Sequence, residues 1–259
     1  MRAGTGAAYR LLTIVVLALL PGVAAAADEK DPAPADGEEN ASNPLAPVNN
    51  TDLKYQYLDL GRGDRHDLFV DGAYMLQPKL KLIYELHYWE TNVTGHSEND
   101  VETLLLKPLY FPRTGELDVW KYRLAVGLEW IVDFNHFDKG IGSGADQLAP
   151  LVAVALSSPA RGLTVIPVVQ HFVSYNGKDV NRTTFRFIGI KGLPGNLWAT
   201  ADAKIPIDWE NDNAVPASVK LQLGKMFSPH FGVFGEGLIG LGGDRPYDHG
   251  IGLGLRIKY

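Results

Sequence analysis

The chain has 259 residues and a formal net charge of −6, and hydrophobic residues make up 46% of it against 21% charged residues. This composition is too polar for a bundle of membrane-spanning helices and too apolar for a disordered chain, and the excess of acid argues against a nucleic-acid partner, which needs a basic face. Cysteine is absent, which excludes disulfides, thiolate catalysis, cysteine-bound zinc and a lipid-modified N-terminal cysteine.

The first residues have the features of an export signal. Arg2 and Arg10 give a positive start, the apolar segment 11–20 follows, and Pro21 precedes an alanine run at 24–27 that satisfies an Ala-x-Ala cleavage rule. A membrane anchor is the alternative, but this apolar segment is shorter than the roughly 18 residues that a spanning helix needs, and no later segment reaches that length. The sequence therefore predicts a cleaved signal peptide at residues 1–26.

Residues 27–50 are rich in Pro, Ala, Asn and acid. Between residues 28 and 39, six acidic residues accompany a single cation, Lys30. Such a segment cannot bury enough apolar surface to offset the entropy lost on ordering. We therefore expect residues 27–50 to form a flexible periplasmic tail.

From about residue 51 onward the apolar period is two, as in a β-strand. In the clearest stretch, 120–134, every even-numbered residue is large and apolar, whereas the odd-numbered ones include Lys121, Arg123, Glu129 and Asp133. Soluble strands usually run about 5–6 residues, so this stretch is too long for a soluble sandwich, which is the alternative. Ten residues at the tilt of a barrel strand span roughly 25 Å, the height of the apolar band of an outer-membrane barrel. The aromatic residues expected at its two boundaries are Trp120, Tyr122, Trp130, Phe134 and Tyr259.

Breaks in this alternation predict the number of strands. Short turns are expected at 77–78, 112–115, 158–162, 192–196 and 228–229, and longer polar loops at 61–65, 91–99, 135–146, 176–181, 210–214 and 243–248. Eleven connections join twelve strands, and an even number lets an antiparallel meander close on itself. The sequence therefore predicts an all-β fold, a transmembrane antiparallel up-and-down barrel of about twelve strands over residues 51–259.

Inward-facing charges suggest how such a barrel would select solutes. If the short turns face the periplasm, as in outer-membrane barrels, a basic collar falls in the periplasmic half of the lumen, formed by Lys79, Lys81, Lys107, Lys121, Arg123, Lys220, Arg256 and Lys258. Acidic residues fall in the extracellular half, namely Glu129, Asp133 and Asp208. The collar would favour anionic solutes or hold the acidic residues 28–39 as a plug; the alternative is a wet lumen in which these charges pair with one another.

No motif predicts a catalytic, cofactor or metal site. The GxGxxG pattern at 235–240 lies in a strand pattern with no helix after it, as a dinucleotide site would need. The acids at 208, 210 and 212 lack the glycine and final glutamate of a calcium loop. His171 and Ser174 are the candidates for a lipid hydrolase, but residues three apart on one strand point to opposite faces.

The C-terminus alternates to its last residue, Tyr259, and resembles the final strand by which the barrel-assembly machinery recognises outer-membrane proteins. The stretch 43–259 is also similar to a group of proteobacterial outer-membrane barrels named for the meta-pathway of phenol degradation. The likeness runs through the segments LKLIYELHYWETNVTG, YRLAVGLEW and VPASVKLQLGKMF. It implies a place in the outer membrane of a Gram-negative bacterium, in contact with its lipid, and brings no catalytic motif.

These observations together predict a non-enzymatic channel for the passive passage of small solutes, anionic or aromatic. Gly250, Gly252 and Gly254 would face inward and leave room for passage, whereas inward aromatics such as Trp89 and Trp198 argue for the alternative, a filled structural or binding barrel. An outer-membrane lipid hydrolase is a third possibility.

Overall fold

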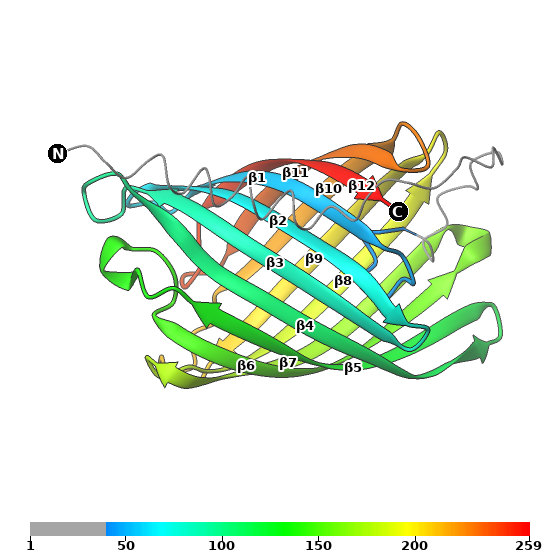
Figure 1. Ribbon diagram of the computed structural model, residues 1–259, viewed down its shortest axis with the longest axis horizontal. Coiled ribbons are helices and arrows are strands. Elements are labelled where there is room, and N and C mark those ends of the chain that lie inside the picture. The colour runs from blue at the N-terminus through cyan, green and yellow to red at the C-terminus, as the bar shows by residue number, and fades with distance from the viewer. Residues whose placement is uncertain (1–39) are drawn as a thin grey trace. The chain divides into compact units, whose positions relative to one another are not determined.

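The computed structural model describes residues 40–259, so the predicted signal peptide and most of the predicted tail lie outside the described residues. The described part is a barrel of long tilted strands (Figure 1). The strands are β1 (Asn50–Asp59), β2 (Asp64–Gln77), β3 (Leu80–Thr91), β4 (Glu98–Leu117), β5 (Trp120–Asp133), β6 (Ala145–Ser158), β7 (Leu163–Gly177), β8 (Asn181–Leu193), β9 (Leu197–Asp208), β10 (Ala217–Met226), β11 (Phe231–Leu241) and β12 (His249–Lys258).

Every strand pairs antiparallel with its neighbours in sequence, and β1 pairs with β12 to close the ring. The predicted twelve-stranded up-and-down barrel is confirmed. Helical structure within residues 40–259 is limited to two 3-10 turns, Phe137–Lys139 and Pro159–Arg161. No helix in this part of the chain has the length and apolar character needed to span a membrane.

One predicted turn is wrong. The breaker cluster at 112–115 lies inside β4, which runs unbroken for 20 residues, and the chain reverses at Asp118 and Val119 instead. Asp118 adopts a left-handed backbone with φ of 54°, which aspartate tolerates better than most residues. The pairing of β4 with β5 shifts between Tyr110 and Arg113, so Pro112 sits at an irregularity where its missing N–H donor is accommodated.

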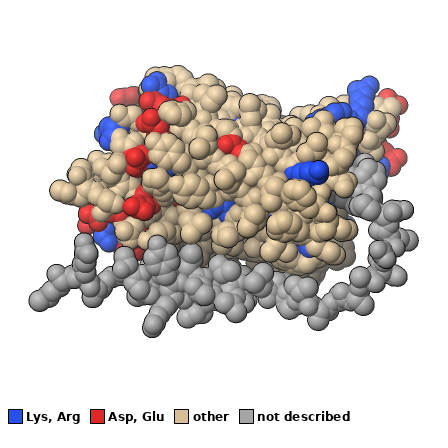
Figure 2. Space-filling model, turned by 90° about the horizontal axis from the view of Figure 1, so that it is seen from above, with Lys and Arg blue, Asp and Glu red and all other residues tan. Residues whose placement is uncertain are grey.

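The outer face of the barrel is apolar and exposed. On β12 Leu253 is 70% exposed and Ile251 65%, whereas Arg256, on the other parity, is 3% exposed. On the face seen in Figure 2, charged side chains gather mainly at the two ends of the barrel and few interrupt the middle. An exposed apolar band around a closed barrel is what lipid contact requires, and a soluble sandwich would bury it.

The inward-facing glycines of β12 were expected to leave space in the lumen, but neighbouring side chains fill that space. A Cβ on Gly254 would collide with the ring of Phe234, and one on Gly250 with the side chain of Leu58. Because Phe234 and Leu58 are themselves buried, the strand carries glycine so that neighbouring side chains can lie over it. This stretch of the inner wall is therefore packed.

The predicted boundary aromatics lie near both ends of the outer face. Trp130, Phe134 and Tyr259 are exposed, and Trp120 and Tyr122 are half-buried near the turns. Near the loops, Trp130 Nε1 donates a hydrogen bond to the hydroxyl of Tyr175 at 2.7 Å. Trp and Tyr side chains each combine an apolar ring with a polar N–H or O–H group, which suits them to the boundary between lipid and water.

A charge on the outer face should therefore destabilise the barrel according to its depth. We expect Leu253→Arg, in the middle of β12, to lower the free energy of unfolding by about 2–4 kcal/mol, because the guanidinium would lie in hydrocarbon. The matched change Leu241→Arg, at the loop end of β11, should cost only about 0–1 kcal/mol. Guanidinium titration of the protein folded into liposomes measures both, and equal costs would contradict the membrane position.

Candidate functional site: the barrel lumen

The barrel encloses a cavity of about 640 Å³, lined by residues from every strand except β6. This volume falls within the roughly 300–1,000 Å³ typical of small-molecule sites. Nine Lys and Arg side chains and seven Asp and Glu side chains contribute to its lining. The lumen is thus polar and densely charged, as the parity of the strands requires.

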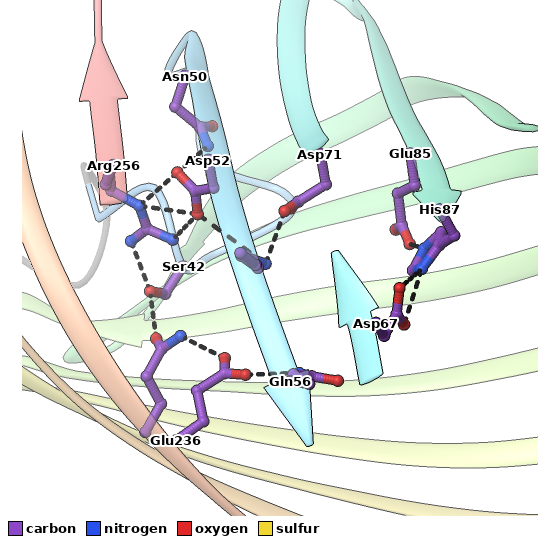
Figure 3. Close-up of polar contacts among 12 residues, drawn as sticks. Ser42, Asn50, Asp52, Gln56, Asp67, Asp71, Glu85, His87, Glu236 and Arg256 are labelled. Carbon is purple, nitrogen blue, oxygen red and sulfur yellow. Dashed lines mark hydrogen bonds and ion pairs between the residues drawn. The ribbon is translucent and has the colours of Figure 1, made fainter. Parts of the chain in front are cut away.

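Several of these charges pair closely across neighbouring strands. Arg256 on β12 lies directly opposite Asp52 on β1, and its Nε and Nη2 donate to the Asp52 carboxylate at 3.0 and 2.6 Å (Figure 3). Further ion pairs in the lumen wall join Lys54 to Asp71 at 2.8 Å, Lys107 to Glu129 at 2.5 Å, Arg186 to Asp202 at 2.6 Å and Lys220 to Glu236 at 3.3 Å. These pairs stiffen the wall and neutralise much of its charge.

A second group bridges two carboxylates through a histidine. The Nδ1 of His87 lies 3.0 Å from Asp67 Oδ2, and its Nε2 lies 3.4 Å from Glu85 Oε2. The His87 ring also stacks on Phe69, with centroids 4.5 Å apart. In Figure 3 the ring stands between the two acids, so it is held on both edges and on one face.

Some cations keep open positions toward the cavity. Lys204 on β9 lies directly opposite Arg186 on β8, and within residues 40–259 it forms no hydrogen bond or ion pair. Two like charges at directly opposed positions disfavour folding. Adjacent cations on the inward face of a barrel are typical of a surface that contacts anions.

Two arginines near the loops stack on aromatic rings. The guanidinium carbon of Arg65 lies 3.9 Å from the ring centroid of Trp89, and that of Arg182 lies 4.7 Å from the ring centroid of Phe172. The Nε of each arginine is buried without a hydrogen-bond partner. Because β2 and β8 lie six positions apart in a ring of twelve strands, the two pairs occupy opposite walls.

The segment from Asn40 to Asn49 enters the lumen at the end of the short turns. Ser42 Oγ donates to Gln222 Oε1 on β10 at 3.0 Å and accepts a hydrogen bond from Arg256 Nη1 on β12 at 2.7 Å. The predicted free tail is therefore wrong for these residues. The segment is tied to the inner wall by specific polar contacts.

On the other side of the barrel the same segment meets β3 and β5. Lys81 Nζ donates to the Ala46 carbonyl at 2.7 Å, and Arg123 Nη1 donates to the Leu45 carbonyl at 2.9 Å. Leu45 and Ala46 are 2% and 1% exposed. Since β3 and β5 lie five positions around the ring from β10 and β12 respectively, the segment spans the lumen. We call residues 40–49 the crossing segment.

The crossing segment separates two spaces. Ala41, Ser42 and Pro44 line the large cavity, whereas Leu45 and Pro47 line a second cavity of about 380 Å³ with residues from the ends of β4, β5 and β6. The segment is thus a partition between the lumen and the turn end of the barrel.

The residues of the predicted basic collar do not form one ring but lie in different parts of the barrel. Lys81, Lys107, Lys220 and Arg256 line the large cavity, and Lys121 and Arg123 line the smaller one. Lys258 lies opposite Asn50 at the end of β12. Lys79 does not reach the lumen, because it lies in the exposed turn between β2 and β3.

The predicted acids also have different surroundings. Glu129 lines the large cavity. Asp133 instead caps the loop that follows it, accepting hydrogen bonds from the backbone N–H groups of Asn135 at 2.7 Å, Ser143 at 2.7 Å and Gly144 at 3.0 Å. Asp208 ends β9, where its carboxylate accepts from the Glu210 N–H at 3.2 Å. Only Glu129 of the three lines the large cavity.

The same loop is held from a second side by a lysine. Lys139 Nζ donates to Asp100 Oδ2 at 2.8 Å, and this hydrogen bond raises the pKa of Lys139 above its ordinary value. Together with the Asp133 cap, it ties the residues between β5 and β6 to the rim of the barrel. The loop is therefore a fixed part of the entrance.

The sequence motifs that were considered as cofactor, metal or catalytic sites have other surroundings in the structure. The GxGxxG pattern forms part of β11. Within residues 40–259 no group of three or more His, Asp or Glu side chains is arranged so that it could hold a metal ion. His171 Nδ1 lies 3.0 Å from Thr183 Oγ1, whereas Ser174 Oγ accepts from the backbone N–H of Val180 at 3.0 Å. His171 and Ser174 thus have separate partners.

Comparisons with known proteins rest on structure alone, because no family model and no curated sequence matches the chain. An outer membrane channel from Pseudomonas putida F1 is 11% identical with a TM-score of 0.58, and covers 89% of this chain and 100% of its own. KdgM porin in complex with disordered oligogalacturonate is 8% identical with a TM-score of 0.55, at 81% and 99% coverage. Outer membrane phospholipase A from Escherichia coli is 13% identical with a TM-score of 0.52, at 87% and 98% coverage.

The chain has the fold of Gram-negative outer-membrane barrels. At these identities the likeness extends to the fold alone, which is shared by porins, a channel and a phospholipase. The choice between a channel and an enzyme must therefore rest on the residues of the lumen and of the outer face, and not on the fold.

The buried pair of Arg256 and Asp52 should be a point of high sensitivity. Asp52→Asn leaves the Arg256 guanidinium buried without its counter-charge, and we expect a loss of about 3–5 kcal/mol in the free energy of unfolding. The matched control is Arg245→Gln, which breaks an exposed pair with Asp248 and should cost about 0–1 kcal/mol. Urea titration followed by tryptophan fluorescence compares the two, and similar costs would show that the inner pair is hydrated.

Proposed function

We propose that the protein is an outer-membrane channel for the passive passage of small solutes. The observation that carries this proposal is the charged cavity of about 640 Å³ inside a closed barrel whose outer face is apolar. A barrel embedded by its outer face and hollow inside offers a polar route across hydrocarbon. The fold likeness to a channel from Pseudomonas putida F1 supports it.

Anions are the solutes that this lumen suits best. Three cations that line the cavity, Arg65, Arg182 and Lys204, form no ion pair within residues 40–259. They would attract a carboxylate or another anion and replace part of its hydration. KdgM porin, which shares the fold, has been seen with an oligogalacturonate, whose units carry carboxylates.

Two further parts of the proposal rest on the sequence. The terminal strand ending at Tyr259 is the expected recognition signal for the barrel-assembly machinery, and the likeness to the family named for phenol degradation makes aromatic acids one class of anions to test. A filled structural barrel is the alternative, since the crossing segment spans the lumen.

Conductance in planar bilayers tests the channel directly. We expect openings that favour anions, and we expect Lys204→Gln to lower the chloride-to-potassium permeability ratio on the order of twofold, because it removes an open cation from the wall. Lys225→Gln, on the outward face of the neighbouring strand β10, should leave that ratio unchanged.

A variant lacking residues 40–48 completes this experiment. The partition would be gone, so its conductance should exceed that of the intact chain. A lumen that stays silent in both proteins would reject the channel and favour the filled barrel.

The phospholipase likeness and the contact of His171 with Thr183 make lipid hydrolysis a second candidate. Within residues 40–259 no carboxylate and no amide oxygen hydrogen-bonds His171, so the ring lacks the group that orients a catalytic base. We expect no release of fatty acid from phospholipid vesicles, and no change in conductance for His171→Ala. Hydrolysis that disappears in this variant would establish the enzyme instead.

A further inference from the structure

Lys81 is a buried cation with an unusual partner. It is 1% exposed, and its Nζ donates to the neutral carbonyl oxygen of Ala46. Within residues 40–259 it forms no ion pair. A buried ammonium ordinarily has a carboxylate beside it, because a neutral acceptor compensates only part of the lost hydration. The position of the Ala46 carbonyl is therefore one where a negative charge would be more stable.

A second cation points at the same place. Arg123 Nη1 donates to the carbonyl of Leu45, the residue before Ala46. Two cations thus converge on two consecutive backbone oxygens. A carboxylate presents two oxygens of the same kind and adds the charge that the peptide lacks, which makes each hydrogen bond shorter and stronger.

A buried apolar cluster lies beside these cations, and the Arg123 guanidinium carbon is 5.2 Å from the ring centroid of one of its members, Phe111. The side chain of Leu45 packs into a buried cluster on the inner wall of β4 to β8, formed with Leu109, Phe111, Ala125, Leu151, Ala153, Ala155, Ile166, Ile188 and Ile190. Elsewhere the inner wall carries charged side chains with scattered apolar ones such as Phe69 and Leu238, so this continuous apolar cluster departs from the polar lumen usual for such barrels. It also accounts for the run LAPLVAVAL at 148–156 in β6, where residues of both parities are apolar.

We propose that Lys81, Arg123 and the apolar cluster around Leu45 form a binding site for a monocarboxylate with a compact apolar body, and that the crossing segment fills the site in the absence of such a ligand. The carboxylate binds Lys81 and Arg123 in place of the Ala46 and Leu45 carbonyls, and the apolar body takes the place of the Leu45 side chain. Ligand binding and retention of the segment are mutually exclusive. The proposal deepens the proposed channel by naming a solute class and the site that receives it.

The contacts explain why the segment can leave. Three cationic side chains contact it through neutral oxygens, namely the carbonyls of Leu45 and Ala46 and, at Arg256, Ser42 Oγ. Further contacts with the wall, from Ser42 Oγ to Gln222 and from the Met75 N–H to Asn49 Oδ1, are hydrogen bonds between uncharged groups. A ligand carrying a full charge competes favourably for Lys81, whose hydrogen-bond partner within residues 40–259 is the Ala46 carbonyl alone. Arg256 keeps its counter-ion Asp52 when the segment leaves, so displacement strands no charge on that side.

Calorimetry in detergent on the folded chain produced without residues 1–26 tests the site without requiring conductance. Hexanoate should bind, whereas acetate, which lacks the apolar body, and hexanol, which lacks the charge, should bind at least tenfold more weakly. Lys81→Gln should weaken hexanoate about tenfold, because one charge-assisted hydrogen bond is lost. Lys79→Gln, in the exposed turn two residues earlier, is the matched control and should bind as the unmodified protein does.

Displacement is tested by a thiol in this chain without cysteine. Ala46→Cys should react slowly with a hydrophilic maleimide, since the position is 1% exposed, and hexanoate should accelerate the reaction at least fivefold. Ser228→Cys, in the exposed turn between β10 and β11, should react at one rate throughout.

Equal binding of hexanoate, acetate and hexanol, or hexanoate binding unaffected by Lys81→Gln, would overturn the site. Hexanoate binding without faster labelling of position 46 would overturn the displacement. Neither result depends on conductance, so the channel itself would stand or fall separately.

Discussion

The need to pair every backbone N–H and C=O inside a membrane governs this molecule. Hydrocarbon offers no partner for these groups, so a sheet that spans it must have no free edge. The chain meets this constraint by joining β1 to β12 over ten consecutive residue pairs, from Asn50 opposite Lys258 to Asp59 opposite His249. Closure then fixes which parity faces lipid and which faces the lumen, and the distribution of charge follows from that division.

The fold was predictable from the sequence because strand parity is a local property. Residues 120–134 alone reveal the period, the length and the polarity of each face. The false turn at Pro112 shows the limit of local signals, since a proline and a glycine mark a turn or an irregular strand equally well. Pairing with β5 decided the outcome, and that pairing depends on tertiary structure.

The lumen was predictable only in part. Parity alone would also have placed Lys54, Lys204 and Asp202 inside, but which charges pair depends on register between strands, and register is not visible in one strand's sequence. The crossing segment escaped prediction because its composition matches that of a disordered tail. Its order comes from Lys81, Arg123 and Arg256, which lie far away in the sequence.

The covalent continuity between the crossing segment and β1 has a kinetic consequence. Asn49 directly precedes Asn50, the first residue of β1. A segment that leaves its site therefore remains tethered to the barrel through a few residues. Its local concentration at the empty site is then of millimolar order, as for other short tethers, whatever the amount of protein in the membrane. Rebinding of the segment is then a first-order process. A ligand must therefore compete with the tethered segment for the site, and its apparent affinity is lower than it would be for an empty site.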